Sequence, residues 1–332
     1  MRMTIDAEIL RALRTNEAGS VSGADLSQRL NISRAAIWAR IEELRHLGYD
    51  IEASPHRGYT LRDSPDLLHA DDLLSRLREG QVIGRTIRVF QTTTSTNDIA
   101  EKFARDGVAE GAVVFAESQS TGRGRLGRQW TSPTGKGLWF SVLLRPNLTP
   151  QAVTKLTIAS ATATARAIKT ITTLEPKVKW PNDLLISGKK ISGILTELTA
   201  ELDHVKHVIL GIGINVNLTE SDFPASLRST ATSLRIQAGH PINRPDFAAE
   251  VLRQLDFDYN RVVKGMFPEV AEEWESISCT LDQDVEIQVG DRKITGRAES
   301  LDQDGALLVR SQHGRLDRVI GGDVSMSTKS ST

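Results

Sequence analysis

The chain has 332 residues, a formal net charge of −1, 39% hydrophobic residues and 25% charged residues. These proportions are those of ordinary globular proteins, and the length predicts two or three domains rather than a single core. The balanced charge excludes a protein whose overall field attracts nucleic acid, so any DNA contact must come from a local patch.

The composition also argues against a disulfide scaffold and a membrane-spanning protein. Cys279 is the only cysteine, which excludes an internal disulfide and fits a reducing compartment. No apolar run approaches the ~20 residues that span a bilayer, and the charged segment Met1–Leu10 does not resemble a signal peptide. We therefore expect a cytoplasmic protein that makes no membrane contact.

Residues 1–64 are expected to form a winged helix-turn-helix domain. Apolar residues at helical spacing and serine caps predict three helices, and two short strands around a turn predict the wing. The expected elements are Ile5–Leu13, Ser22–Leu30, Ser33–Leu47, Tyr49–Glu52 and Gly58–Leu61.

The third of these helices carries the candidate DNA contacts. Ile37, Ile41 and Leu44 share one face and are expected to pack inward. Small residues on the opposite face let a helix enter a groove, and an arginine near its start can reach a phosphate or a base edge. The candidate DNA-binding residues are Ser33, Arg34, Ala35, Trp38 and Arg57. The alternative is a small helical interaction module with no role on DNA.

Residues 65–275 are expected to form a second domain that mixes helices and strands. The polar connection Arg62–Leu68, which contains Pro65, marks its start. Hydrophobic periodicity predicts the following elements in chain order: helix Ala70–Arg78, strand Ile87–Phe90, helix Ile99–Asp106, strands Ala112–Ala116 and Gly137–Leu144, helix Pro150–Thr170, a hairpin within Lys177–Glu197, strand His207–Val216 and helix Asp246–Val262.

A glycine- and arginine-rich segment, Ser118–Arg128, follows the first buried strand of this domain. Its glycines let backbone N–H groups approach an anion, and its arginines supply forked donors that match carboxylate or phosphate. The alternating residues are Gly122, Arg123, Gly124, Arg125, Gly127 and Arg128. The segment is either a phosphate clamp or a solvated basic loop that touches nucleic acid nonspecifically, and short motifs of this kind do not decide between the two.

The hairpin within Lys177–Glu197 is a second candidate for chemistry. Ser187-Gly188 is a turn signal between two short apolar strands. The preceding turn, Trp180-Pro181-Asn182-Asp183, leaves a carboxylate beside Lys179 and, across the hairpin, Lys190. The alternative is an ordinary surface hairpin with lysines on its polar side.

Three further features leave a structural and a ligand-binding interpretation open. The hydroxyl-rich run Thr92–Asp98 either only caps the helix after it or also binds a polar ligand group. Gly211 and Gly213 either permit tight packing or let a ligand ring approach the backbone. The polar segment Leu218–Ser233 is expected to be a mobile loop.

Residues 276–332 change character, and short alternating strands separated by glycine turns predict a small all-β domain. The expected strands are Val285–Val289, Arg292–Leu301, Ala306–Arg310 and Arg315–Ile320. Ser327–Thr332 is expected to be a disordered tail.

Together these segments resemble the bifunctional biotin protein ligases that also repress the biotin operon. The resemblance covers the whole chain and implies an α+β fold: a winged helix-turn-helix, a mixed-sheet core like that of class II synthetases, and a small SH3-like β-barrel. The matching motifs are Ser95-Thr96-Asn97, Gln119, Gly122-Arg123-Gly124-Arg125, Lys179-Trp180-Pro181-Asn182-Asp183, Lys190 and Gly211-Ile212-Gly213-Ile214-Asn215.

The sequence departs from the family at a few positions. Ser192 stands where alanine is common, and Leu126 stands where some members carry another arginine. Leu218–Ser233, where the family covers adenine, matches poorly, so no residue there is assigned.

The resemblance implies a two-step acyl transfer. The biotin carboxylate attacks the α-phosphate of ATP, and a lysine of a biotin carboxyl carrier protein then attacks the resulting biotinyl-5′-adenylate. Both steps pass through states with extra negative charge, which cationic donors stabilise. Mg²⁺ is expected with ATP, held mainly by the phosphates, and no metal site made by the protein alone is expected.

The resemblance also assigns residues to each part of this reaction. Biotin is expected to contact Ser95, Thr96, Asn97, Gln119, Arg123, Gly124, Arg125, Lys190, Gly193, Gly211 and Gly213. ATP and the adenylate are expected to contact Arg123, Arg125, Arg128, Trp130, Lys179, Asn182, Lys190 and Asn215. The expected catalytic residues are Arg125, Lys190, Asp183 and Lys179, with Lys190 bridging the reacting groups and Asp183 orienting the incoming lysine.

Partners beyond the carrier protein are operator DNA and a second copy of the chain. We expect an adenylate-bound homodimer, with the apolar strand Val208–Val216 as the candidate edge that extends a sheet across the two-fold axis. Two alternatives stay open: a ligand-sensing repressor without catalysis, and a lipoate ligase, which shares the core fold. The intact Arg125 and Lys190 argue against the first, and the lysine-tryptophan-proline turn with the winged helix argues against the second.

Overall fold

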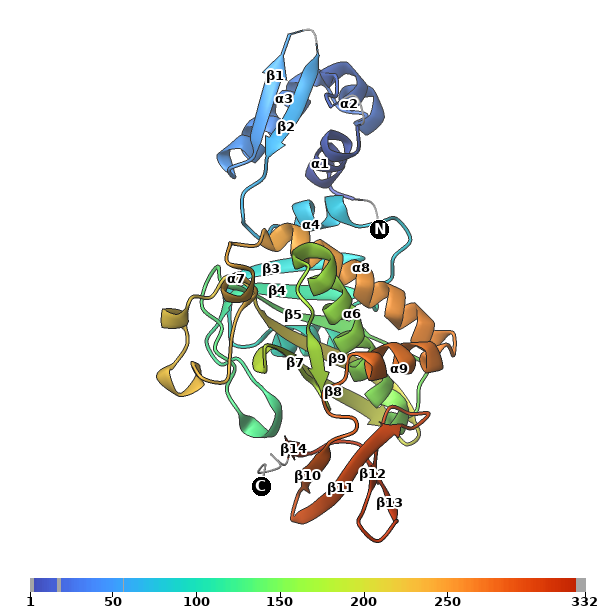
Figure 1. The fold of residues 1–332 in the computed structure, drawn as a ribbon. Helices are drawn as coiled ribbons and strands as arrows, with labels where there is room; N and C mark the ends of the chain where they lie inside the picture. Colours follow the sequence, from blue (N-terminus) through green and yellow to red (C-terminus); the bar gives the residue numbers. More distant parts are fainter. Residues whose placement is uncertain (1–2, 17–18, 56, 327–332) are drawn as a thin grey trace. The chain divides into compact units, whose positions relative to one another are not determined.

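The computed structural model describes residues 3–16, 19–55 and 57–326 (Figure 1). Residue 56 of the expected wing turn and the expected tail, 327–332, lie outside these described residues. The chain forms two compact units, of which the first comprises Met1–Gly80 and Asn243–Ala249. The second comprises Gln81–Ile242 and Glu250–Thr332.

The first unit has the expected three helices and two-stranded wing. Its elements are α1 (Ile5–Thr15), α2 (Gly23–Leu30), α3 (Arg34–His46), β1 (Asp50–Ser54), β2 (Gly58–Asp63) and α4 (Ala70–Arg76). Ser22 and Ser33 accept hydrogen bonds from backbone N–H groups of the helices they precede, at 3.0 and 3.1 Å, which confirms the predicted caps. Ile37, Ile41 and Leu44 are fully buried, as their spacing predicts.

A buried carboxylate joins α4 to the helices of this unit. Asp72 of α4 is 0% exposed and forms ion pairs with Arg14 of α1 at 2.7 Å and with Arg76 at 3.0 Å. A buried charge is tolerated only when it is paired, so these two arginines account for the acidic residue in this position. The sequence had placed α4 in the second domain, and the structure packs it on α1.

A seven-stranded mixed sheet forms the centre of the second unit, with the order β3-β4-β5-β9-β8-β7-β6. Its strands are β3 (Thr86–Thr93), β4 (Ala112–Gln119), β5 (Gly137–Leu144), β6 (Lys177–Lys179), β7 (Asp183–Ile186), β8 (Lys189–Glu201) and β9 (His204–Asn215). β3 and β4 are parallel and the other neighbours are antiparallel. The predicted mixed sheet is confirmed.

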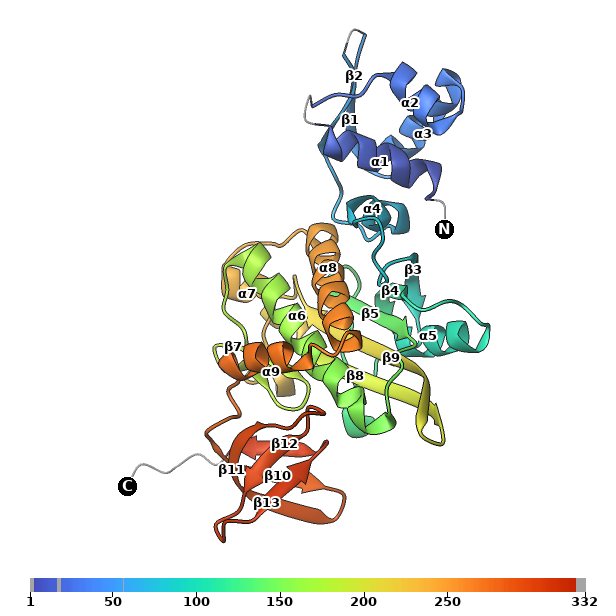
Figure 2. The same cartoon turned by 90° about the vertical axis from the view of Figure 1, so that its right-hand side faces the viewer.

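Helices cover both faces of the sheet (Figure 2). α5 (Thr96–Arg105) packs on β4, β5 and β9, and α6 (Thr154–Thr172) packs on β6, β7 and β8. Between two helical layers a strand is buried on both sides, which is why every residue of β5 is buried. The remaining helices are α7 (Leu234–Ala238), α8 (Arg244–Val263) and α9 (Phe267–Ser276), and the sequence analysis missed α7 and α9. Among the described helices, none combines the length and apolar character that crossing a bilayer requires.

The prediction that Val208–Val216 forms a sheet edge is wrong. These residues belong almost entirely to β9, which pairs with β5 on one side and β8 on the other. The strand is apolar because both of its faces are covered, and an apolar sequence does not distinguish a central strand from an edge. The outermost strands of the sheet are β3 and β6, and β8 also has an open stretch, because β7 pairs with it only as far as Gly193. From Leu195 to Glu201, β9 is the only described strand that pairs with β8.

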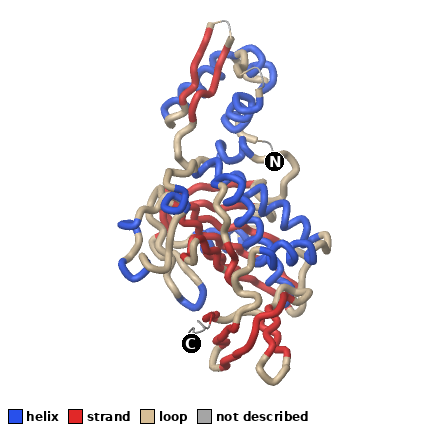
Figure 3. The backbone as a smooth tube through the Cα atoms, in the orientation of Figure 1, coloured by secondary structure: helices blue, strands red, loops and turns tan. Residues whose placement is uncertain are grey.

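The C-terminal residues form a five-stranded antiparallel domain with the order β13-β12-β11-β10-β14. The strands are β10 (Asp284–Val289), β11 (Arg292–Leu301), β12 (Leu307–Arg310), β13 (Leu316–Val319) and β14 (Asp323–Met326). Figure 3 shows it as strand and loop throughout, which confirms the predicted all-β character. The sequence analysis missed β14.

We predict that Leu143→Ala lowers the free energy of unfolding by about 2–5 kcal/mol, because it leaves a cavity under α5. Leu143 is 0% exposed and packs in one cluster with Ala100 and Ala104 of α5. Leu202, which is 98% exposed, provides the matched control, and Leu202→Ala is expected to change stability by less than about 0.5 kcal/mol. Denaturant unfolding of both variants measures the difference, and equal losses would contradict this account of the core.

Candidate functional site

One cavity of about 570 Å³ lies in the second unit, within the size range of small-molecule sites. Every residue that the sequence analysis assigned to biotin, ATP or catalysis lines it. They come from the start of α5, the end of β4, the glycine-arginine segment, the hairpin of β7 and β8, and β9. The structure therefore brings together segments that lie more than 100 residues apart in the chain.

The glycine-arginine segment reaches this cavity with its outer arginines already paired to carboxylates. Arg123 forms ion pairs with Asp98 of α5 and, at 3.4 Å, with Glu197 of β8. Burial alone would lower the pKa of Arg123, but the hydrogen bond to Asp98 and the charge of Glu197 outweigh it and raise the pKa. Arg128 pairs with Asp323 of β14. Carboxylates of three separate elements thus hold this segment.

The middle arginine of the segment has neutral partners. Arg125 donates to Asn182 Oδ1 at 3.0 Å and to the Gly322 carbonyl oxygen at 3.3 Å. Burial lowers the pKa of its guanidinium, with Asp183 and Asp323 acting in the opposite direction. A partly desolvated cation to which the described residues offer no direct carboxylate partner interacts strongly with any anion that enters the cavity.

Lys190 and Asp183 form an ion pair of 2.6 Å between Nζ and a carboxylate oxygen. Lys190 lies near the start of β8, where a bulge against β7 shifts the register, and a bulge can re-aim a side chain. Its ammonium also lies 5.4 Å from the ring centroid of Trp130, a cation–π distance. The preceding turn has positive φ at both Ser187 and Gly188, as the predicted two-residue hairpin requires.

The glycines of this site make room for side chains. A Cβ on Gly211 would clash with the amide oxygen of Asn97, and a Cβ on Gly213 would lie 2.6 Å from the indole nitrogen of Trp130. A Cβ on Gly193 would lie 3.0 Å from the same indole ring. The structure confirms tight packing, with the side chains of Asn97 and Trp130 as the packed groups. Gly211 and Gly213 also line the cavity, so their contact with a ligand ring stays a prediction.

The start of α5 and the end of β4 are joined by hydrogen bonds. The helix begins at Thr96, three residues earlier than predicted. Gln119 accepts from the backbone N–H of Thr96 at 2.9 Å, and its amide nitrogen donates to Ser132 at 2.9 Å. Ser132 is buried and was missed by the sequence analysis, since nothing in its neighbourhood marks it.

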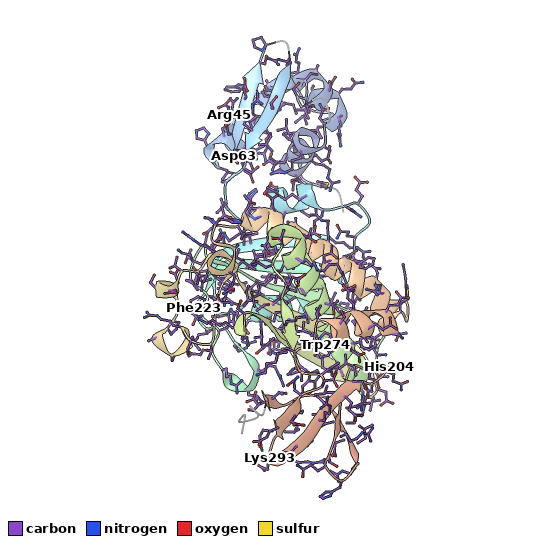
Figure 4. The ribbon with its side chains drawn as sticks, viewed as in Figure 1. Arg45, Asp63, His204, Phe223, Trp274 and Lys293 are labelled. Carbon is purple, nitrogen blue, oxygen red and sulfur yellow. The ribbon has the colours of Figure 1, made fainter. Side chains whose placement is uncertain are left out.

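Several lining residues escaped prediction, and two groups of them lie outside the matched motifs. Within Leu218–Ser233, two 3₁₀ turns form, and Leu218 and Phe223 pack against Trp139 in an apolar cluster. Figure 4 labels Phe223 on this segment. The second group, Gly322 to Ser325, comes from the C-terminal domain. Isolated apolar residues in a polar stretch could have indicated the first group, but no local signal places the second at this cavity.

In the first unit, the predicted DNA-binding residues of α3, its cap Ser33 and Arg57 of the turn between β1 and β2 are all exposed. Trp38 is 58% exposed, which is unusual for a large apolar side chain. The Ser33 hydroxyl is already used as the cap of α3.

Three family models match this chain. A biotin/lipoate A/B protein ligase family matches residues 89–215, a helix-turn-helix domain matches residues 7–60, and a biotin protein ligase C-terminal domain matches residues 280–327. These matches fall in the same order as the winged helix, the cavity-bearing core and the five-stranded domain.

Curated relatives match over almost the whole chain. The bifunctional ligase/repressor BirA of Bacillus spizizenii is 35% identical over 328 residues, which are 98% of this chain and 100% of that protein. The chain belongs to the bifunctional ligase/repressor family. The Escherichia coli member of this family is 30% identical over 326 residues, 97% of each chain.

Solved structures of biotin protein ligases share the architecture of the second unit of this family member. The ligase from Aquifex aeolicus, in complex with biotin and ATP, is 30% identical with a TM-score of 0.63, covering 73% of this chain and 99% of that one. The ligase from Leishmania major in complex with biotinyl-5-AMP is 25% identical with a TM-score of 0.51, covering 71% and 98%.

We predict that Gly211→Ala lowers the free energy of unfolding by about 1–3 kcal/mol, because the added methyl group clashes with Asn97. In an Asn97→Ala background the amide is gone, so the same change is expected to cost less than about 1 kcal/mol. A double-mutant cycle by denaturant unfolding measures this coupling. Additive effects would mean that Asn97 does not explain the glycine.

Proposed function

We propose that this protein is a biotin protein ligase that forms biotinyl-5′-adenylate from biotin and ATP and transfers biotin to a lysine of a carrier protein. We further propose that it represses transcription in response to biotin. The observation that carries the ligase proposal is the arrangement of Lys190, Arg125 and Asp183 around one cavity. Two cations and a carboxylate there suit the activation of a carboxylic acid by a nucleotide phosphate.

The biotin end of the cavity is assigned to the start of α5. Thr96 and Gln119 offer polar atoms for a ureido ring, and Phe140, Leu195 and Ile212 supply an apolar wall for the sulfur ring and the aliphatic tail. This mixture of an apolar wall and a few polar groups is typical of small-molecule sites.

The nucleotide end is assigned to the glycine-arginine segment and Leu218–Ser233. Leu218 and Phe223 supply an apolar surface for adenine. The buried indole N–H of Trp130 has no hydrogen-bond partner among the described residues, so it is available to an acceptor on the ligand. Arg123 and Arg128 can exchange their carboxylate partners for phosphate oxygens without losing their charge pairing.

The ion pair between Lys190 and Asp183 suggests how the two steps are linked. In the first step the ammonium of Lys190 leaves Asp183 to bridge the biotin carboxylate and the α-phosphate, whose combined negative charge exceeds that of one carboxylate. The released Asp183 then accepts a hydrogen bond from the incoming lysine of the carrier protein and orients it for attack. Lys179 and Arg125 stabilise the charge that develops on phosphate.

Mg²⁺ is proposed to accompany ATP. Asp183 and Asp323 are the only carboxylates among the described residues that line the cavity, and both already pair with cations. This donor set fits an ion held mainly by phosphate oxygens and water, with one or two carboxylates in addition. The ion would neutralise phosphate charge in the first step.

Lipoate ligation and catalysis-free sensing are the alternatives. The matched core model includes lipoate ligases, but the matched C-terminal model and the solved relatives that bind biotin favour biotin. Mass spectrometry of an acceptor domain after incubation with ATP and biotin, lipoate or neither distinguishes all three. Biotin attachment is the expected result, and attachment of lipoate or of nothing would overturn the proposal.

We predict that Lys190→Ala reduces the rate of biotinyl-adenylate formation by about 10²–10³-fold with little change in thermal stability. The neighbouring Lys189 starts the same strand but does not line the cavity, so Lys189→Ala is the matched control and should retain near-normal activity. Pyrophosphate release measures the rate. Near-normal activity of Lys190→Ala would refute its assigned role, and unfolding would assign it to structure.

The repressor part of the proposal rests on the first unit and on the open stretch of β8. One winged helix contacts few phosphates, so tight operator binding needs two copies on a palindromic site. The stretch of β8 from Leu195 to Glu201 pairs with β9 alone among the described strands, and Leu198 is 43% exposed, so its other side can extend the sheet across a two-fold axis. A repressor that uses ATP must be where both ATP and its operator DNA are found. A cytoplasmic location is therefore part of the proposal.

We predict that biotinyl-adenylate shifts the protein from monomer to dimer and raises operator affinity in parallel, because ligand and dimer stabilise each other. Sedimentation and DNA-binding titrations measure the two effects. Arg34→Ala should weaken DNA binding without changing dimerisation. The slope of log affinity against log salt concentration should fall by the equivalent of about one phosphate contact. The exposed Arg310 of the C-terminal domain is the control. If biotinyl-adenylate changes neither the molecular mass nor the DNA affinity, the protein acts as a ligase only and the repressor part of the proposal is wrong.

A further inference from the structure

A chain of hydrogen bonds runs beneath the part of the cavity that the proposed function assigns to the biotin ring, and the inference below rests on that function. It connects Glu197 of β8, Asn97 and Thr96 of α5, and Ser141 of β5. Ser141 is 0% exposed, and Asn97 and Thr96 are each 3% exposed. The sheet register places Ser141 opposite Gly211, whose bare Cα leaves room for the Asn97 amide.

The partners of Asn97 fix which way its amide faces. Glu197, as a carboxylate, can only accept hydrogen bonds, and the Asn97 amide nitrogen donates to it at 2.7 Å. The amide oxygen therefore faces the other way, where the Ser141 hydroxyl lies 2.6 Å from it. Because an amide oxygen can only accept, Ser141 must donate its single hydrogen to Asn97.

This assignment in turn fixes the hydroxyl of Thr96. The oxygens of Ser141 and Thr96 are 2.7 Å apart, so one of them donates to the other. Since the Ser141 hydrogen is committed to Asn97, Thr96 is the donor. Its other polar neighbour, Gln119 Oε1, is more distant at 3.3 Å and already accepts from the Thr96 backbone N–H at 2.9 Å. The Thr96 hydroxyl can therefore offer only lone pairs to a ligand.

We infer that Glu197, Asn97 and Ser141 are positioning residues that hold the Thr96 hydroxyl as a hydrogen-bond acceptor, so that the cavity selects a ring carrying an N–H at that point. Biotin meets this requirement because its ureido ring has two N–H groups. A ring oxygen in the same place would bring its lone pairs against those of the Thr96 hydroxyl oxygen. In a buried site no hydrogen bond would compensate for this repulsion, so such a ring binds less tightly. Arg123 donates to the same Glu197 carboxylate, so one residue both orients the Asn97 amide and holds the glycine-arginine segment.

The test compares biotin with the two analogues in which one or the other ureido N–H is replaced by oxygen. The measured quantity is kcat/KM for adenylate formation. The wild-type protein should prefer biotin over at least one analogue by about tenfold or more. In Ser141→Ala the Thr96 hydrogen is released and can turn toward the ring oxygen, so the preference for biotin should fall by about tenfold at similar thermal stability.

Two further variants keep the inference falsifiable if Ser141→Ala fails to fold. Glu197→Gln lets the Asn97 amide turn over, after which Ser141 can donate to Thr96, and the same loss of preference is expected. Ser160→Ala is the matched control, because Ser160 is also buried but donates to a backbone carbonyl of α6. It should leave the preference unchanged.

Three results would overturn the inference. If Ser141→Ala and Glu197→Gln lower kcat/KM for biotin and both analogues by the same factor, these residues serve only the structure. If Thr96→Val leaves KM for biotin unchanged while the wild-type protein attaches biotin, other residues recognise the ureido ring and only the inference fails. If the wild-type protein attaches no biotin, the proposed function fails together with the inference.

Discussion

The cavity depends on the close contact between the amide of Asn97 and the bare Cα of Gly211. The amide reaches that position only because α5 packs flat on β4, β5 and β9, so that its first turn lies over the middle strands of the sheet. Once there, a buried amide must find partners for both of its polar atoms. Glu197 and Ser141, from strands on either side of β9, supply them. One steric constraint thus fixes the hydrogen-bond pattern of the cavity floor.

A second organising feature is that, among the described residues, more cations than carboxylates line the cavity. Asp98, Asp183 and Asp323 pair with Arg123, Lys190 and Arg128 respectively. In the proposed function, phosphate and carboxylate oxygens of the ligand replace these carboxylates as partners of the cations, which keeps the desolvation cost of the cations low in both states.

The C-terminal domain belongs to this arrangement through β14. Gly322 and Asp323 contact Arg125 and Arg128, so the glycine-arginine segment bridges the mixed sheet and the five-stranded domain. This explains why a small all-β domain follows a ligase core: its end contributes to the wall of the cavity. Cys279, in the connection between them, is half-buried, and its thiol donates to the Val178 carbonyl.

The sequence by itself determined the features that depend on local backbone preferences. The caps at Ser22 and Ser33 fixed two helix starts, and positive φ at Ser187 and Gly188 closed the predicted hairpin. The motifs also identified the side chains around the cavity. Only the tertiary structure decided that β9 is a central strand and that β8 has a stretch that β7 does not pair.

It also decided that Phe223 and Asp323 line the cavity, that Ser141 bonds to Asn97 beneath it, and that Gly211 leaves room for the Asn97 side chain. The reason is physical: caps and turns are set by interactions within a few residues, whereas strand order and cavity walls arise from packing between segments distant in the chain. A short sequence window carries no record of that packing.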